Sequence, residues 1–199
     1  MSLSGAVQLT SGVVFIAAGA WTRALLKHSG LDLPVVPLSQ TRFTTSRMPG
    51  IRSEMPLILV KTRPAYYIRE ENGGLLIGGN ELEIPAERYP DVNNPPTRDR
   101  IPNGQAYRIR EAIRTLEPIM PVLADAEIDQ IASGLPTYTK DLMFVADEVP
   151  GCSDVYCLTA CKEAGVTHGP ALARHLTDLA VDATSRWDPE LFGIDRFHT

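Results

Sequence analysis

Two short apolar segments, one near each end of the chain, constrain the fold more than any other feature of the sequence. Residues 12–18 (GVVFIAA) are continuously apolar and rich in β-branched side chains, which predicts a strand buried on both faces. Val155–Thr159 is predicted to be a second buried strand. A helix is predicted after each strand, at residues 21–28 and at residues 170–183, the latter with Pro170 in its first turn.

The sequence between these segments is typical of an antiparallel sheet. Residues 70–74 (EENGG) tolerate positive φ and predict a tight hairpin turn. Residues 105–120 carry apolar side chains at helical spacing, which predicts an amphipathic helix lying on the sheet. Five prolines within residues 84–103 predict an irregular surface connection. The predicted strands are residues 35–45, 57–60, 65–69, 75–78, 127–138 and 143–147.

The order of these elements predicts an α+β fold with a mainly antiparallel sheet of five or more strands, flanked by parts of a Rossmann-like layer. A doubly wound domain that is interrupted by an antiparallel domain leaves this pattern if its first βαβ unit is missing. We expect residues 1–32 and 151–199 to form the flanking layer. Residues 33–150 should form the antiparallel domain, with the helix at residues 105–120 covering one side of its sheet. The first and last strands of the chain should then lie side by side.

Net charge and cysteine content narrow the classes of partner. The formal net charge of −5 at pH 7 opposes binding to nucleic acid, which requires a basic surface. No apolar run approaches the length of a membrane span, and the first residues lack the features of a signal peptide. Three cysteines are an odd number in a chain of this size, which favours reduced thiols. We therefore expect a cytoplasmic protein with neither a nucleic-acid partner nor a membrane span.

Several sequence blocks, in order, carry a resemblance to a known family. Residues 13–22 (VVFIAAGAWT) and the segment LPVVPLSQ that begins at Leu33 resemble a strand-to-helix signature and the entry into a substrate domain. The hairpin AYYIREENGGLLIGG, the block Thr139-Lys-Asp, residues 155–166 and the C-terminal FGIDRF are similar to later parts of the same family. The family is the D-amino-acid oxidase superfamily of FAD-dependent enzymes, which includes glycine and sarcosine oxidases.

The resemblance implies oxidation of a carbon–nitrogen bond in an amino acid or secondary amine. FAD accepts the hydride, so the protein mainly binds and orients the substrate. Lys162 and Thr167 flank Gly165 and are expected to face the flavin. The residues that the resemblance places against the cofactor are Ala17, Ala18, Gly19, Trp21, Ala160, Cys161, Lys162, Gly165, Val166 and Thr167.

The sequence departs from the family pattern in two places. It has no G-x-G-x-x-G loop for the cofactor pyrophosphate, so we expect that an N-terminal FAD-binding half acts with this chain in cis or in trans. The chain alone should then bind FAD weakly or not at all and be inactive. In the closing glycine motif, residues 160–165 read ACKEAG, with Glu163 where the family has bare backbone and Ala160 at a position expected to have negative φ.

The predicted substrate-side residues are Tyr66, Tyr67, Arg69 and His168. A substrate carboxylate calls for a cation and hydrogen-bonding aromatic side chains, and Tyr67 and Arg69 share one face of a strand by the two-residue period. The alternative is that these two are ordinary sheet-surface residues. His168 could equally be a surface or capping histidine, and Thr167 could be a helix N-cap. No catalytic residue is assigned.

Two other classes of function were weighed. A metal site built on Cys157, Cys161, His168 and His175 is disfavoured, because buried cysteine is a common small apolar residue and no second closely spaced pair exists. The stronger alternative is a non-catalytic module that binds a small molecule or a partner without flavin. Such a module would share the middle strands, but it would leave the segments around Gly19 and Gly165 without a purpose.

Overall fold

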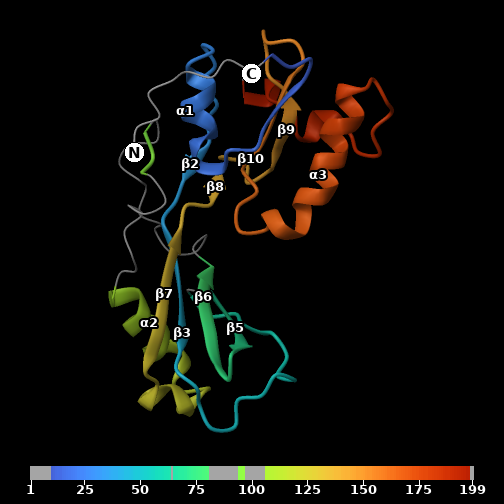
Figure 1. Cartoon of the computed structure of the whole chain (residues 1–199). Helices are drawn as coiled ribbons and strands as arrows, with labels where there is room; N and C mark the ends of the chain where they lie inside the picture. Colours follow the sequence, from blue (N-terminus) through green and yellow to red (C-terminus); the bar gives the residue numbers. More distant parts are fainter. Residues whose placement is uncertain (1–9, 64, 81–93, 97–105, 198–199) are drawn as a thin grey trace. The chain divides into compact units, whose positions relative to one another are not determined.

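The computed structural model describes residues 10–63, 65–80, 94–96 and 106–197. Most of the predicted surface connection at residues 84–103 lies outside these ranges. The chain forms two compact units. Unit 1 combines Met1–Val36 with Thr137–Thr199, and unit 2 is Pro37–Pro136 (Figure 1).

The first boundary lies close to the expected division after residue 32, whereas the second precedes the expected division after residue 150. The reason is the pairing of β9 (Val145–Glu148), which hydrogen-bonds to β10 (Val155–Thr159) in unit 1. The residues assigned by sequence to the end of the antiparallel domain therefore belong to the other unit.

The sheet of unit 1 joins both ends of the chain, as predicted. β1 (Val14–Ile16) pairs in parallel with β10, with Val14 opposite Val155 and Ile16 opposite Cys157. β9 adds an antiparallel strand on the other side of β10. Helical segments cover both faces of this sheet (Figure 1).

The two faces of the sheet carry separate cores because successive residues of β9 and β10 point in opposite directions. Val145 and Cys157 pack with Leu26 of α1 (Thr22–Lys27), which follows the short 3-10 turn Gly19–Trp21. On the opposite face, Ala146 and Tyr156 pack against Leu172 and Leu176 of α3 (Gly165–Ala180). Two further 3-10 turns follow α3, and their bounds are Pro189–Leu191 and Asp195–Phe197.

β1 differs from its expected burial on both faces. Val14 is 43% exposed and Phe15 is 51% exposed, because β1 is an edge strand of the unit 1 sheet. The apolar composition of a central strand thus occurs at an edge, where an unpaired backbone is open to a further strand.

α3 begins at Gly165, five residues before the proline that was expected in its first turn. Pro170 lies inside the helix, where it has no N–H to donate to the preceding turn. The alternative role of Thr167 as a helix N-cap is therefore wrong, since Thr167 lies within the first turn and its N–H donates to the Ala164 carbonyl (3.0 Å).

Unit 2 is built on a five-stranded sheet in which all pairs are antiparallel, as predicted. The hairpin that joins β5 (Ala65–Glu71) to β6 (Gly74–Asn80) turns at Asn72 and Gly73, with φ of 52° and 82°. In spatial order, the strands are β4 (Ile58–Val60), β5 (Ala65–Glu71), β6 (Gly74–Asn80), β3 (Gln40–Thr45) and β7 (Ile128–Gly134).

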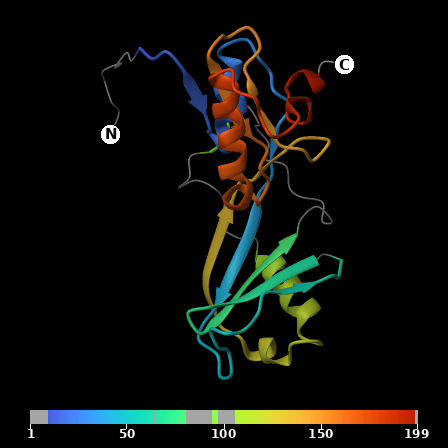
Figure 2. The same ribbon diagram turned by 90° about the vertical axis from the view of Figure 1, so that its right-hand side faces the viewer.

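One face of this sheet is covered by α2 (Ala106–Leu116) and the 3-10 turn Pro121–Asp125. Figure 2 shows α2 behind β5 and β6. The core beneath it contains nine buried side chains: Phe43, Tyr66, Ile68, Leu75, Ile77, Ile109, Ala112, Leu116 and Leu123. Where the chain passes between the units, β2 (Val36–Pro37) pairs with β8 (Thr137–Tyr138). The mixed α/β architecture with mainly antiparallel sheets confirms the predicted fold class.

Candidate functional site

The two segments that the sequence assigns to the cofactor meet at the carboxyl ends of the strands in the unit 1 sheet. Parallel strands end on the same side of a sheet, so the loops after β1 and β10 are neighbours. The Thr159 hydroxyl at the end of β10 donates to the Gly19 carbonyl across 3.3 Å. Ligands of α/β sheets commonly bind at the carboxyl ends of strands. We call this region, which consists of residues 17–21 and residues 160–167, the carboxyl-end site.

The loop after β10 has a strained backbone. Ala160 has φ of 58° and Lys162 has φ of 52°, in the left-handed region that favours glycine. The expectation of a negative φ at Ala160 was therefore wrong. β8 supports this loop: the Ala160 N–H donates to the Thr137 hydroxyl (3.1 Å), and the Lys162 N–H donates to the Thr137 carbonyl (3.1 Å). Thr137 is a supporting residue that the sequence analysis did not single out.

The start of α3 offers backbone donors at the same edge. No side chain caps this N-terminus, and Val166 in the first turn is 94% exposed. The N–H groups of Thr167 and His168 already donate to the Ala164 carbonyl, so the groups without a partner inside the helix are those of Gly165 and Val166. The helix dipole favours a partly negative group beside them. These atoms fit a carbonyl edge such as that of a flavin ring. The sequence provides no glycine-rich loop for a pyrophosphate, so the fit is to the ring end of FAD alone.

The Glu163 side chain has a hydrogen-bond partner on β8. The buried Tyr138 hydroxyl donates to a Glu163 carboxylate oxygen at 2.6 Å. Sequence reasoning identified Glu163 as a departure from the family motif but not its partner. Tyr138 directly precedes Thr139-Lys-Asp, one of the blocks that carried the resemblance. Its contact with the loop that contains Glu163 depends on the fold and could not be predicted from the sequence.

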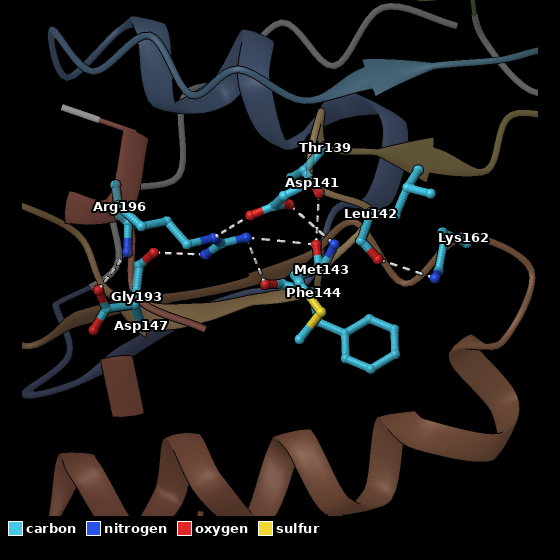
Figure 3. Close-up of polar contacts among 10 residues, drawn as sticks. Thr139, Asp141, Leu142, Met143, Phe144, Asp147, Lys162, Gly193 and Arg196 are labelled. Carbon is cyan, nitrogen blue, oxygen red and sulfur yellow. Dashed lines mark hydrogen bonds and ion pairs between the residues drawn. The ribbon is translucent and has the colours of Figure 1, made fainter. Parts of the chain in front are cut away.

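An arginine clamp fastens the C-terminal segment to the loop after β8 (Figure 3). Arg196 donates to the Asp141 carboxylate (2.8 Å), to the Phe144 carbonyl (2.9 Å) and to the Gly193 carbonyl (2.5 Å). Burial alone would raise the pKa of Asp141, but hydrogen bonds from Arg196, Thr139 and the Met143 N–H lower it to about 2. The clamp keeps the loop that supports the carboxyl-end site in place.

Lys162 and His168, two residues singled out from the sequence, gather around Phe144. The Lys162 ammonium donates to the Leu142 carbonyl (3.0 Å) and lies 5.6 Å from the centre of the Phe144 ring (Figure 3). The exposed His168 ring lies 4.9 Å from the same ring, and its Nδ1 contacts the Ala164 carbonyl at 3.1 Å. Both side chains therefore border the carboxyl-end site.

The remaining cofactor-side residues differ in accessibility. Gly19 and Ala17 are exposed, and Trp21 is 37% exposed. Ala160 is fully buried, and Cys161 is half-buried, with a thiol pKa that burial raises. Ala18, Lys162 and Gly165 are half-buried, and Thr167 is exposed.

Cys157 is fully buried, and burial together with the nearby Asp147 raises its pKa to about 12. The described ranges contain no group of three His, Cys, Asp or Glu side chains that could hold a metal ion. None of the helices in the part of the chain that the structure describes has both the length and the apolar character needed to cross a membrane.

In unit 2, the predicted substrate residues divide between the two faces of the sheet. Tyr66 is 5% exposed and packs in the core beneath α2, where burial raises its pKa. Tyr67 and Arg69 lie on the opposite face, which we call the open face. Arg69 donates to the Glu71 carboxylate and to the Glu70 carbonyl (3.0 Å). The structure thus keeps Tyr67 and Arg69 together and separates Tyr66 from them.

Comparison with known proteins identifies relatives over most of the chain. A family model described as DAO, FAD dependent oxidoreductase, matches residues 3–179. The 4-methylaminobutanoate oxidase (formaldehyde-forming) of Paenarthrobacter nicotinovorans is 25% identical over 92% of this chain and 22% of its own length. Glycine oxidase of Pseudomonas aeruginosa is 30% identical over 83% of this chain and 41% of its own length.

A solved structure shares the fold. Glycine oxidase from Geobacillus kaustophilus superimposes with a TM-score of 0.74 at 21% identity, over 92% of this chain and 45% of that one. The chain therefore spans less than half the length of these relatives.

Proposed function

Because the chain belongs to the DAO family of FAD-dependent oxidoreductases, we propose that it is part of an enzyme that oxidises the carbon–nitrogen bond of an amino acid or secondary amine. The bound flavin supplies the hydride acceptor. The observation that carries the proposal is the parallel pairing of β1 with β10, which unites Gly19 and the loop 160–167 at one sheet edge. The names of the relatives, which include amine and amino-acid oxidases, support the substrate class.

At the carboxyl-end site, the chain holds the ring end of FAD through backbone groups. The residues proposed to contact it are those around Gly19 and Gly165, with Lys162 and Thr167 beside them. His168 borders this site and is proposed to contact the substrate or the ring. The Asp141–Arg196 clamp and Thr137 position the loop rather than contact the cofactor.

The pyrophosphate end of FAD is proposed to bind a separate segment with a G-x-G-x-x-G loop, acting in cis or in trans. The exposed edge of β1 supports this proposal, because Val14 and Phe15 offer an apolar, unpaired strand to a neighbouring one. The three free cysteines are consistent with a reducing compartment, and we propose the cytoplasm.

Cofactor content tests this proposal. The purified chain alone should be colourless and bind FAD weakly or not at all. Co-expression with an N-terminal half that carries the glycine-rich loop, from the same gene or from Pseudomonas aeruginosa glycine oxidase, should yield a yellow complex with flavin absorption. A folded partner that forms a complex without flavin would instead favour a non-catalytic binding module.

The open face of unit 2 is proposed to bind the substrate carboxylate near Tyr67 and Arg69. An arginine bound to a carboxylate gains charge-assisted hydrogen bonds of roughly 1.5–3 kcal/mol. In the flavin-loaded complex, Arg69→Ala should therefore raise KM for amino-acid substrates about tenfold to a hundredfold. Arg69→Lys should restore part of the loss, because it keeps the charge and loses the planar fork. Unchanged kcat/KM in Arg69→Ala would remove this residue from the site.

A further inference from the structure

A cavity at one end of the unit 2 sheet has no part in the proposed function. It has a volume of about 530 Å³ and is open to solvent. Its walls come from the segment that follows β3 and from the β5–β6 hairpin. Sites for small molecules in proteins typically have volumes of about 300–1,000 Å³. The cavity is therefore large enough for a small organic ligand.

The cavity lies on the side of the sheet that α2 covers. Tyr66 of β5 points into the core beneath α2, and Glu70, four residues further along the same strand, shares its face. Met48 and Ile51, which line the cavity with Glu70, pack against the same core. The cavity is thus separate from the open face, where the substrate is proposed to bind.

Hydrogen bonds join the two walls of the cavity. The Met48 N–H donates to the Gly73 carbonyl (2.9 Å), and the Ile51 N–H donates to the Met48 carbonyl (3.3 Å). Within the hairpin, the Gly73 N–H donates to a Glu70 carboxylate oxygen at 2.6 Å. Because the walls are held together before any ligand arrives, a ligand would lose little binding energy in ordering them.

Arg47 gives the cavity a positive charge. Its side chain lies against Gly73, which has φ of 82°, and a Cβ atom there would come within 2.9 Å of the Arg47 Cγ and Nε atoms. Arg47 is exposed, and among the residues that the structure describes its side chain has neither an ion-pair nor a hydrogen-bond partner. Its guanidinium is therefore available to an anion.

The other lining residues narrow the kind of anion. Met48, Pro49 and Ile51 offer apolar surface beside the guanidinium, which suits a ligand with an apolar body. The carboxylate of Glu70 lines the same cavity and would repel a second negative charge on the ligand. A ligand with one negative charge and an apolar body fits this combination better than a phosphate ester does.

We infer that this cavity binds a small monocarboxylic acid with an apolar body, and that Arg47 holds its carboxylate. The planar guanidinium can donate two parallel hydrogen bonds to the two carboxylate oxygens. The inference does not depend on the proposed function, because no residue of the open face or of the carboxyl-end site lines the cavity.

Titration of the full 199-residue chain with hexanoate tests this inference without requiring flavin. In NMR spectra, the Arg47 Nε–H and the Gly73 backbone N–H signals should shift and saturate. Hexanamide, which has the same shape and no charge, should bind at least tenfold more weakly than hexanoate. Acetate, which has the charge and almost no apolar body, should also bind at least tenfold more weakly.

Variants of exposed residues identify the groups that bind. Arg47→Ala should weaken hexanoate binding at least tenfold, and Arg47→Lys should recover part of the loss. Arg52→Ala is the matched control, because it removes the same charge from the same segment at an exposed residue that does not line the cavity. It should leave binding unchanged. Glu70→Gln should strengthen the binding of hexyl phosphate more than that of hexanoate, because it removes the repelling charge.

Two results would overturn the inference. One is equal binding of hexanoate by Arg47→Ala and by the unchanged chain, with circular dichroism showing that both are folded. The other is loss of binding in Arg69→Ala instead of Arg47→Ala, which would place the acid on the open face. If the complex with the N-terminal half binds no flavin, the proposed function fails, whereas hexanoate binding by the chain still decides the role of Arg47.

Discussion

At the scale of single residues, several residues other than glycine have backbone conformations that suit other residue types better. Leu142 has φ of 60° and is 42% exposed, so its side chain gains little from burial while its backbone is strained. Asparagine tolerates the left-handed region far better than leucine. We therefore expect Leu142→Asn to stabilise the chain by about 0.5–1 kcal/mol, measured by urea unfolding.

Leu191 provides the matched control for this change. It is 51% exposed, and its φ is not positive, so Leu191→Asn should leave the free energy of unfolding nearly unchanged. Equal effects of the two substitutions would mean that surface hydrophobicity, and not backbone strain, determines the result.

Thiol reactivity gives a second residue-scale prediction. Cys157 is fully buried and its pKa is raised to about 12, so the native protein holds it as an unreactive thiol at neutral pH. Iodoacetamide at pH 8 should modify the half-buried Cys152 first and reach Cys157 after unfolding. Mass spectrometry of peptides at increasing urea concentration would measure the order, and early modification of Cys157 would contradict the packing of β10.

At the scale of elements, the Asp141–Arg196 clamp links stability to pH. The pKa of Asp141 is about 2 in the folded chain against an ordinary value of 3.8, so its contribution is present above about pH 3.8 and is lost as the pH falls toward 2. Asp141 is 41% exposed, and solvent screening limits this contribution to about 1 kcal/mol. Asp141→Asn should therefore lower stability at pH 7 by about this amount and have a smaller effect near pH 3.

Asp129→Asn serves as the comparison for the clamp, because Asp129 is an exposed strand residue. It should change stability little at either pH. Loss of stability that is the same at pH 7 and near pH 3 in Asp141→Asn would show that the carboxylate charge plays no part in the clamp.

Elements with local signals were predictable from the sequence, and elements that depend on distant neighbours were less so. The Asn72–Gly73 turn and the face of α2 follow from turn chemistry and helical spacing, and both agree with the structure. The start of α3 was misjudged because Pro170 is a strong helix-start signal, whereas the helix continues upstream of it to Gly165. The exposure of β1 depends on which strands lie beside it, which composition cannot reveal.

In the candidate site too, some features were predictable from the sequence and others depend on residues that are distant in the sequence. The segments around Gly19 and Gly165 were predicted by resemblance, and the structure brings them together through the parallel strands. Thr137 was missed, because its support of the loop 160–167 depends on how β8 lies beside that loop.

At the scale of the whole molecule, unit 2 is continuous in sequence and has a core of its own. Such a segment can fold independently. We expect the fragment 37–136 to show a cooperative urea transition by circular dichroism. Leu116→Asp, which places a charge in that core, should abolish the transition. A fragment without cooperative unfolding would mean that unit 2 depends on unit 1 for its stability.

In unit 1, by contrast, the pairing of β1 with β10 affects the order of folding. β1 is synthesised long before its partner β10, since Val14 pairs with Val155. Closing so long a loop carries a large entropic cost, and non-local parallel pairing forms slowly. During translation, the apolar β1 segment must wait until the residues up to β10 have emerged from the ribosome. We expect this interval to be when the nascent chain is most prone to aggregation and most dependent on chaperones.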